Sequence, residues 1–425
     1  MKRLFKNGSI AKGDSKEFEK ADVLVGEWGT IELVAPEVSA DTETEVVDCE
    51  GCLLVPGMFD LNVRAREPGF EHKETLVSCA EAALNGGVTG CVLMPDTAPP
   101  TDSGTLVKAV QDLVSENSPI PMLVSGCLTK KREGQAMAGF SGMVSRGVPM
   151  LTDSGNEVQC PDLLRRCMEY ARDFDVLVAC HCNTSALTKA GAVNEGPVSY
   201  RLGLPGIPTI SQEIAIDRDI RVAGFTNARL HLQQVSTRGA VRSVAAAKAD
   251  GVRLTCEVSP HHLLMSEEYI ADYDTKYKLD PPLRCQSDVD AMLRGLIDGT
   301  IDAIASDHSP HTEFEKSSDF ATAPFGVSGL DTTVLALYDG FIKPGYFGWD
   351  LLIQRYSIAP RKIAGVDPVS IKEGEKADFF VFDPNAETAI TREYLKTKSP
   401  VTPFLGRTLA GAIRQTVVGD FCFAK

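Results

Sequence analysis

The sequence predicts an α/β fold: a (β/α)8 TIM barrel accompanied by a small β-sandwich that the N- and C-terminal segments build together. Three observations support this prediction. Eight strand-like apolar runs alternate with amphipathic helical patterns through the middle of the chain. Both ends of the chain are instead rich in short alternating strands separated by Gly, Asp and Pro turns. The length of 425 residues suits one large domain with a smaller satellite.

The eight apolar runs supply the expected barrel strands. They span residues 53–63, 87–95, 121–127, 147–155, 175–182, 228–236, 252–260 and 301–309. Helical patterns separate them, as in residues 162–174, where Leu163, Leu164, Cys167, Met168 and Ala171 recur at helical spacing. Buried strands that alternate with helices form parallel sheets, and eight such units predict a closed barrel of about 300 residues.

The two ends of the chain differ from this middle region. They contain segments such as ADVLVGEWGTIELV and KADFFVFDP, which have the pattern of short strands between tight turns. Two terminal β segments that flank a barrel most simply pair with each other. The sequence therefore predicts a β-sandwich from residues 1–52 and 368–425 beside a barrel from residues 53–367.

Composition and charge argue against several classes of protein. The net charge of −15 disfavours general nucleic-acid binding. No apolar run approaches the ~18–20 residues of a membrane span, and the N-terminus lacks the apolar stretch of a signal peptide. The twelve cysteines are then expected to be reduced, mostly buried thiols. We therefore expect a cytoplasmic protein that binds neither nucleic acid nor membrane.

Polar residues gather where the expected strands end, which in a (β/α)8 barrel is where active sites form. The strand ends carry Asp60, Asn62, Arg64, Arg66, Asp96, Asp153, Ser154, His181, Gln234, His261, His262, Asp307, His308 and His311. The segment KYKLDPPLR adds Lys278, Asp280 and Arg284. Any single one is most simply a solvated or satisfied polar group. Their convergence on one rim indicates a site, because buried charges need partners.

Strand alternation gives the first expectations about side-chain direction. Asn62, Arg64 and Arg66 are two residues apart and should share one face. Cys180 and Cys182 should point away from His181, so we expect their thiols to pack in the core rather than to bind a metal.

Several long motifs occur in order along nearly the whole chain. They are VPGMFDLNVRAREPGFEHKET, GGVTGCVLMPDTAPPTD, VSPHHLLMSEE, LDPPLRCQSDVDAMLRGLIDGTIDAIASDHSPHTEFEK and APFGVSGLDT, followed by KADFFVFDP and TPFLGRTLAGAI. Together they resemble the motifs of type I dihydroorotases of the amidohydrolase superfamily. The resemblance implies an amidohydrolase-type barrel with a terminal β-sandwich. It also implies a role in pyrimidine biosynthesis, where these enzymes open the cyclic amide of dihydroorotate or close carbamoyl-aspartate.

The resemblance further implies a zinc site, and most of its ligand positions are altered in this sequence. Only His181 and Asp307 retain a ligand, and Asp307 also stands at the family's general-base position. A catalytic zinc needs three protein ligands, so two are too few. The positions that hold other residues are Asn62, Arg64, Ser154 and Gln234.

Arg64 is the replacement that bears most on metal binding, because a guanidinium is effectively always protonated. A +1 charge about 4 Å from a +2 ion costs on the order of 8 kcal/mol at an effective dielectric of ~20. We therefore expect no cofactor, and we expect Arg64 to replace the metal by forming a buried ion pair with Asp307.

An alternative remains open in which one zinc ion binds His181 and Asp307 together with Asp153 or His231. His231 lies an odd number of residues before Gln234, so we expect it to face the helices rather than the site.

The positions that hold the substrate in the family are also altered. Arg66 and His311 are retained, whereas Asp96 and Asp280 stand where the family has Asn. Each exchange adds negative charge near an anionic substrate and should weaken its binding by at least ~1 kcal/mol. Loss of groups at two separate parts of the site indicates loss of the reaction.

Three functions are compatible with these observations. The first is a non-catalytic dihydroorotase homologue that serves as an assembly subunit for aspartate carbamoyltransferase, which the resemblance implies for degenerate chains of this kind; it would also form a homo-oligomer. The second is an active cyclic amidohydrolase with an atypical, mononuclear metal site. The third is an interaction protein outside pyrimidine metabolism, similar to the non-enzymatic relatives of dihydropyrimidinase.

Overall fold

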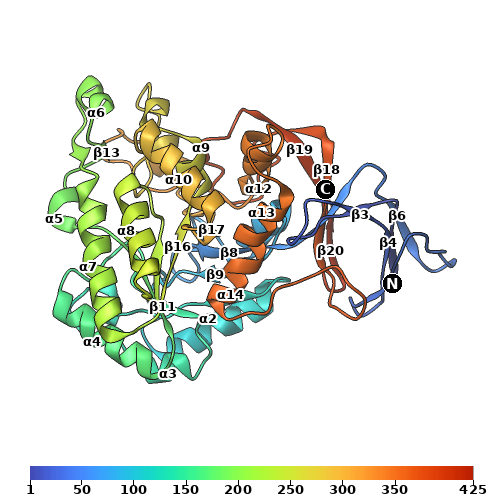
Figure 1. Cartoon of the computed structure of the whole chain (residues 1–425), viewed down its shortest axis with the longest axis horizontal. Helices are drawn as coiled ribbons and strands as arrows, with labels where there is room; N and C mark the ends of the chain where they lie inside the picture. The colour runs from blue at the N-terminus through green and yellow to red at the C-terminus, as the bar shows by residue number, and fades with distance from the viewer. Residues whose placement is uncertain (425) are drawn as a thin grey trace.

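Eight parallel strands close into a barrel in the computed structural model, which describes residues 1–424 (Figure 1). The strands are β8 (Met58–Val63), β9 (Val88–Leu93), β10 (Met122–Val124), β11 (Met150–Thr152), β12 (Leu177–His181), β15 (Leu230–Gln233), β16 (Leu254–Val258) and β17 (Ala303–Ile304). They pair in the orders β10-β9-β8 and β11-β12-β15-β16-β17. Isolated bridges from Gly126 to Leu151 and from Val63 to His308 join the two sheets. Each predicted run contains a strand, and the predicted barrel is confirmed.

Helices surround the barrel (Figure 1). The longer ones are α1 (Leu76–Asn85), α2 (Gly104–Asn117), α4 (Pro161–Asp173), α7 (Ile210–Thr226), α8 (Arg238–Ala249) and α10 (Gln286–Asp298). Shorter ones are α3 (Phe140–Val144), α5 (Ser185–Thr188), α6 (Pro197–Leu202), α9 (Pro260–Leu264), α11 (Glu313–Lys316), α12 (Thr333–Leu337), α13 (Trp349–Ile353) and α14 (Ala359–Ala364). In α4, Leu164, Cys167, Met168 and Ala171 are buried, as their helical spacing predicts.

Short turns and strands complete the connections between these elements. Short 3₁₀ turns lie at Lys130–Arg132, Glu267–Tyr269 and Thr275–Tyr277, and π-helical turns at Tyr338–Ile342 and Gln354–Ile358. A small two-stranded excursion, β13 (Val193–Asn194) and β14 (Gly206–Ile207), follows β12.

Apolar side chains fill the barrel below its mouth. Phe59, Leu61, Met94, Leu177 and Ala179 belong to one buried cluster of inward-facing residues. The next residues along these strands pack outward against the helices in a larger cluster. Because this apolar layer closes the interior, the solvent-accessible polar groups of the strand ends lie at the C-terminal mouth.

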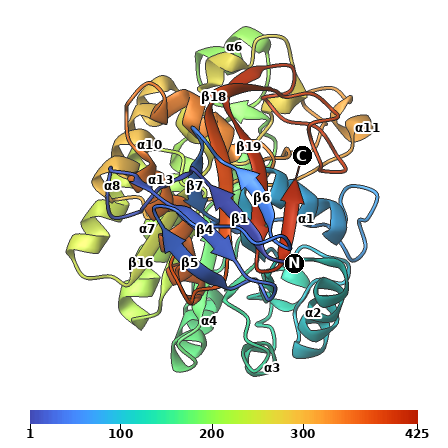
Figure 2. The same cartoon turned by 90° about the vertical axis from the view of Figure 1, so that its right-hand side faces the viewer.

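The two ends of the chain form a second body made of two sheets. One sheet has the order β5-β4-β1-β6 and the other β20-β19-β18-β7-β2-β3. Figure 2 looks onto the N-terminal strands, behind which the long strands β18 and β19 run. Phe5, Val23, Ile31, Leu54 and Phe379 pack between the sheets.

The bounds of these terminal strands are as follows. They are β1 (Arg3–Lys6), β2 (Ser9–Ile10), β3 (Glu19–Lys20), β4 (Asp22–Val25), β5 (Ile31–Ala35), β6 (Glu45–Asp48), β7 (Leu53–Pro56), β18 (Asp378–Ala389), β19 (Thr408–Val418) and β20 (Phe421–Ala424).

The expected boundary between sandwich and barrel at residue 53 needs correction. The apolar run 53–63 holds two strands separated by Gly57. The first, β7, pairs antiparallel with β18, with Leu54 opposite Val381. Barrel pairing begins only at Met58 in β8, opposite Val88. A continuous apolar run looks the same whether one buried strand or two occupy it, which is why the sequence pattern merged them.

All twelve cysteines are free thiols, and most are buried. Cys180 and Cys182 pack in the outer core, as expected from strand alternation. Cys49 and Cys52 form a Cys-x-x-Cys pair in the sandwich core, where burial raises the pKa of Cys49 to about 12. That pKa keeps the Cys49 thiol protonated and unreactive.

Within residues 1–424, none of the helices combines the length and the apolar character that a bilayer span requires.

Candidate active site at the barrel mouth

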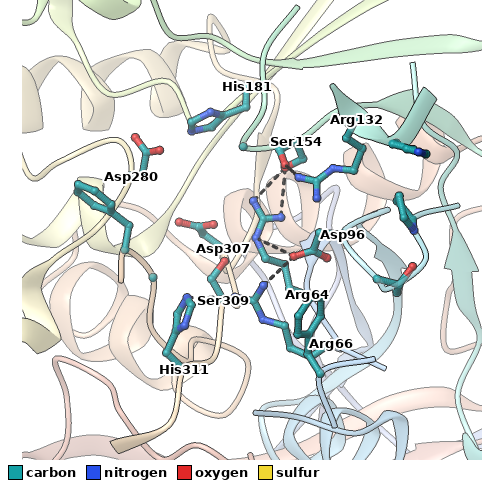
Figure 3. A pocket seen from close by; sticks show the side chains of 17 residues that line it. Arg64, Arg66, Asp96, Arg132, Ser154, His181, Asp280, Asp307, Ser309 and His311 are labelled. Atoms are coloured by element: carbon teal, nitrogen blue, oxygen red, sulfur yellow. Dashed lines mark hydrogen bonds and ion pairs between the residues drawn. The ribbon is translucent and has the colours of Figure 1, made fainter. Parts of the chain in front are cut away.

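A cavity of about 420 Å³ opens at the C-terminal ends of the barrel strands (Figure 3). The sequence-predicted residues that line it are Arg64, Arg66, Asp96, Ser154, His181, Asp280, Asp307 and His311. Asn62 and Gln234 lie fully buried behind this lining. The structure therefore brings together residues from strands far apart in the sequence, as the position of strand ends in a barrel requires.

Arg64 lines the cavity and bonds to residues of neighbouring strand ends. Its backbone N–H donates to His308 O at 2.9 Å, which anchors the end of β8 beside the end of β17. Its Nη1 and Nη2 donate to Ser154 Oγ at 3.2 and 3.0 Å (Figure 3). Its Nε lies 3.8 Å from Asp96 Oδ2. The expected ion pair between Arg64 and Asp307 is therefore wrong, because Asp96 and Ser154 hold the guanidinium instead.

Asp96 carries the negative charge of this arginine cluster. Arg66 Nη1 donates to Asp96 Oδ2 at 2.7 Å, and Arg66 Nη2 lies 3.2 Å from His311 Nε2. Burial raises the pKa of Asp96, but the surrounding guanidinium groups outweigh burial and hold the pKa below its usual value. Burial and the nearby Arg66 lower the pKa of His311 to about 3, so that imidazole is neutral. One carboxylate thus serves several cations.

His181 is held by a carboxylate that the sequence analysis did not single out. Its Nδ1 donates to Glu157 Oε1 at 2.6 Å, and both side chains are buried. Burial by itself lowers the pKa of His181, but Asp280 and Glu157 outweigh burial and raise the pKa to about 9. His181 therefore holds its second ring proton more tightly than a free imidazole does.

Asp307 is bound by Gln234, the residue at which the sequence resemblance expects a histidine. Gln234 Nε2 donates to Asp307 Oδ1. Burial raises the pKa of Asp307 to about 7, and Arg64 and His181 oppose that rise. Both Gln234 and Asp307 have positive φ angles, of 49° and 53°, which are uncommon for residues other than glycine.

A buried polar network lies deeper in the barrel. Asn62 Nδ2 donates to Glu257 Oε1 at 3.0 Å, and Glu257 Oε2 lies 3.1 Å from His231 Nε2. His231 pairs with Ala179, an inward-facing residue, so the expectation that His231 faces the helices is wrong. The expectation assumed that side chains alternate regularly from His231 to Gln234. The positive φ of Gln234 interrupts that alternation.

Asp153 does not reach the cavity occupied by Arg64. Its carboxylate accepts from the backbone N–H groups of Leu128 and Thr129 at 2.9 and 3.0 Å, and from the Thr129 hydroxyl. Burial raises the pKa of Asp153 to about 6, against the effect of those hydrogen bonds. The proposed single-metal set of His181, Asp307 and Asp153 or His231 is therefore not assembled in this structure.

The residues present do not fit the zinc ion that the fold family implies. The guanidinium of Arg64, at a position that the sequence resemblance assigns to one ligand, is bonded to Ser154, at a position that it assigns to another. Asn62 Oδ1 and Gln234 Oε1 have no hydrogen-bond partner among residues 1–424, but neutral amide oxygens are weak ligands for zinc. In the same part of the chain, no three His, Cys, Asp or Glu side chains are grouped to hold a metal.

Sequence reasoning missed two basic residues of the site, Lys131 and Arg132, which line the cavity. Arg132 Nη2 donates to Ser154 O, while Arg132 Nε is buried without a partner among residues 1–424. The run LTKKREG directly after the third strand was the available signal, since polar loop residues after a barrel strand belong to the mouth. Glu157, three residues after Ser154, carries the same signal.

The amino-acid sequence is similar to known proteins over nearly its whole length. A family model described as Dihydro-orotase-like matches residues 51–240. A protein named Dihydroorotase from Carboxydothermus hydrogenoformans is 40% identical over 412 residues, covering 97% of this chain and 95% of the relative. Another from Caldanaerobacter subterraneus subsp. tengcongensis is 36% identical over 418 residues, covering 98% and 96%.

Solved structures of hydantoinases and dihydropyrimidinases share the fold. L-hydantoinase from Arthrobacter aurescens has a TM-score of 0.86 at 19% identity, covering 100% of this chain and 96% of that one. Dihydropyrimidinase from Brevibacillus agri has a TM-score of 0.85 at 20% identity, covering 100% and 95%. The predicted amidohydrolase-type barrel is confirmed by these similarities.

Proposed function

The chain belongs to the dihydroorotase-like family, and from that premise we propose that it is a dihydroorotase-like protein of pyrimidine biosynthesis that has lost hydrolysis. The proposal further assigns it a structural role, as a cytoplasmic, homo-oligomeric assembly subunit for aspartate carbamoyltransferase.

The position of Arg64 is the observation that carries the proposed loss of activity. Its guanidinium is bonded to Ser154 and lies beside Asp96, so a fixed positive charge occupies the place where a dihydroorotase of this family binds a divalent ion. Moving that charge aside would break its contact with Asp96 in a site where all the partners are largely buried. Water activation by a metal, which lowers the pKa of bound water to about 7, has no ligand set here.

The state of the remaining catalytic residue supports the same proposal. Asp307 accepts a hydrogen bond from the Gln234 amide, and burial raises its pKa to about 7. A general base requires access to the proton it abstracts. The Gln234 amide covers one Asp307 oxygen, which reduces that access.

The proposed assembly role is supported by what the chain retains. The barrel and both sheets of the sandwich are complete, while the altered residues either line the mouth or, like Asn62 and Gln234, are buried behind its lining. Subunit contacts depend on the folded surface and not on the metal ligands, so a chain of this kind can still assemble with a partner. The carbamoyltransferase partner itself is an expectation from the resemblance.

Metal analysis combined with an assay of dihydroorotate hydrolysis tests the loss of activity. Purified native protein is expected to hold far less than one zinc ion per chain and to show no turnover above a blank. Near-stoichiometric zinc with genuine turnover would overturn the proposal. Affinity purification at native expression level tests the assembly role, and recovery without aspartate carbamoyltransferase would count against it.

A second candidate function is hydrolysis of cyclic amides by an atypical site, and the names of the relatives favour it. Proteins 35–40% identical over nearly the whole chain are named Dihydroorotase. The same assay decides between the two, because measurable turnover would establish the second candidate whatever metal supports it.

A further inference from the structure

The charged side chains of the barrel mouth are sorted onto two facing walls (Figure 3). Arg64, Arg66 and Arg132 lie on one side around Asp96. Asp280 and Asp307 lie on the other side. The cavity between them measures about 420 Å³, which is within the usual range for small-molecule pockets. In a chain of net charge −15, such a local excess of guanidinium groups points to an anionic ligand.

The guanidinium wall has hydrogen-bond donors left over. A guanidinium carries five N–H donors. Arg64 uses two of its groups on Ser154, and its Nε lies too far from Asp96 for a hydrogen bond, at 3.8 Å. Arg132 Nε is buried and has no partner among residues 1–424. Arg66 also pairs with Asp96, at 2.7 Å. Because one carboxylate faces three guanidinium groups, the wall has a net positive charge. Two carboxylates of a ligand would balance this charge and accept the unused hydrogen bonds.

In the described chain, the opposite wall lacks hydrogen-bond donors for one of its carboxylates. Within residues 1–424, Asp280 accepts no hydrogen bond, although it lines the cavity and lies within electrostatic reach of His181 and Asp307. His181 does not neutralise it by contact, because His181 Nδ1 is bound to Glu157. Because no protein group among the residues that the structure describes donates a hydrogen bond to Asp280, a ligand that carries its own N–H or O–H donor would suit this carboxylate. A plain anion would instead face this carboxylate with like charge.

We propose that the barrel mouth binds a small acidic α-amino acid, with its carboxylates on Arg64 and Arg132 and its ammonium group on Asp280. Such a zwitterion supplies negative charge to the arginine wall and three N–H donors to the carboxylate wall. The inference goes beyond the proposed function, because binding of this kind requires neither a metal nor turnover.

Calorimetric titration of the full-length protein in the presence of EDTA tests the proposal. The probes are L-aspartate, succinate, N-carbamoyl-L-aspartate and inorganic phosphate. L-aspartate should bind about tenfold or more tightly than succinate, which has the same two carboxylates without the ammonium group. Equal binding of aspartate and succinate, tighter binding of N-carbamoyl-L-aspartate or phosphate, or no binding of any probe would each overturn it.

Variants on both walls assign the contacts. Asp280→Asn should bring the aspartate-to-succinate ratio to within about twofold of one, because it removes the charge that distinguishes them. Arg132→Gln should weaken both probes by a similar factor. Asp272→Asn, at an exposed position near the same segment, is the matched control and should leave the ratio unchanged. An unchanged ratio in folded Asp280→Asn protein, checked by circular dichroism, contradicts the assignment.

These experiments distinguish a failure of the proposed amino-acid site from a failure of the proposed loss of hydrolysis. EDTA removes any adventitious metal from the titration, and dihydroorotate turnover is assayed on the same protein without EDTA. Turnover would overturn the proposed loss of activity and leave a measured preference for aspartate intact. Absence of both turnover and binding would overturn the amino-acid site alone.

Discussion

The guanidinium of Arg64 donates to Ser154 Oγ at 3.0 and 3.2 Å, so two side chains that the sequence resemblance assigns to metal-ligand positions bind each other. The contact places a cation in the lining of the cavity at the barrel mouth.

Zinc binding should return when the four replaced ligand positions are restored, provided Arg64 is among them. With Arg64 retained, zinc should bind at least about a hundredfold more weakly, because a fixed +1 charge beside a +2 ion costs several kcal/mol. Metal content after dialysis measures the difference. The full set is Asn62→His, Arg64→His, Ser154→Asp and Gln234→His.

The set of three that keeps Arg64 is the control for this prediction. Equal zinc content in the two proteins would show that Arg64 moves aside freely. Hydrolysis is expected to need Asp96→Asn and Asp280→Asn as well, since a metal site depends on the groups around it.

Asp96→Asn should destabilise the protein by about 3 kcal/mol. The Asp96 carboxylate lies 2.7 Å from Arg66 and is the anion nearest Arg64, and both arginine side chains are mostly buried. Removing one partner of a buried pair leaves uncompensated charge. Urea denaturation measures the change, with Asp272→Asn as a surface control expected within about 0.5 kcal/mol of native. A loss no larger than that of the control would show that solvent already screens the arginine cluster.

Glu257→Ala should cost about 3 kcal/mol, and Glu257→Gln about 1 kcal/mol. Glu257 is fully buried and serves both the Asn62 amide at 3.0 Å and His231 at 3.1 Å. Alanine leaves both partners unsatisfied inside the barrel, whereas glutamine keeps one acceptor. Chemical denaturation of the two variants measures the loss of unfolding free energy in each. Equal effects would mean that the loss comes from packing rather than from the polar network.

Stability should fall between pH 6.5 and 9 because of His181. Burial alone lowers the pKa of His181, but Asp280 and Glu157 outweigh it and raise the pKa to about 9. The unfolded imidazole titrates near 6.5, so the folded state binds the proton more tightly. This contribution, at most about 3 kcal/mol, is complete below pH 6.5 and is lost as the pH rises through about 9.

His181→Gln removes this contribution, so the stability difference between native and variant protein should shrink as the pH rises. Urea denaturation across pH 6 to 9.5 measures it. Glu157→Gln should move the loss to lower pH, because it removes the acceptor of the His181 Nδ1 hydrogen. A difference that stays constant over this range would contradict the raised pKa.

The sequence by itself determined the barrel and the altered chemistry of its mouth. Strand and helix patterns are local, because burial of one face imposes a period of two or 3.6 on neighbouring residues. The long motifs also assign Arg64, Ser154 and Gln234 to expected ligand positions, because the order of motifs along a chain can be read without knowing its contacts. These parts of the prediction needed no information about which segments meet in space.

The tertiary structure alone decided which partners the charged side chains take. Arg64 binds Ser154 and lies by Asp96, Asp307 accepts from Gln234, and His181 donates to Glu157. It also decided that His231 faces inward and that β7 belongs to the sandwich. The physical reason is that a partner depends on distances between strand ends far apart in the chain, and one left-handed residue resets the direction that alternation predicts.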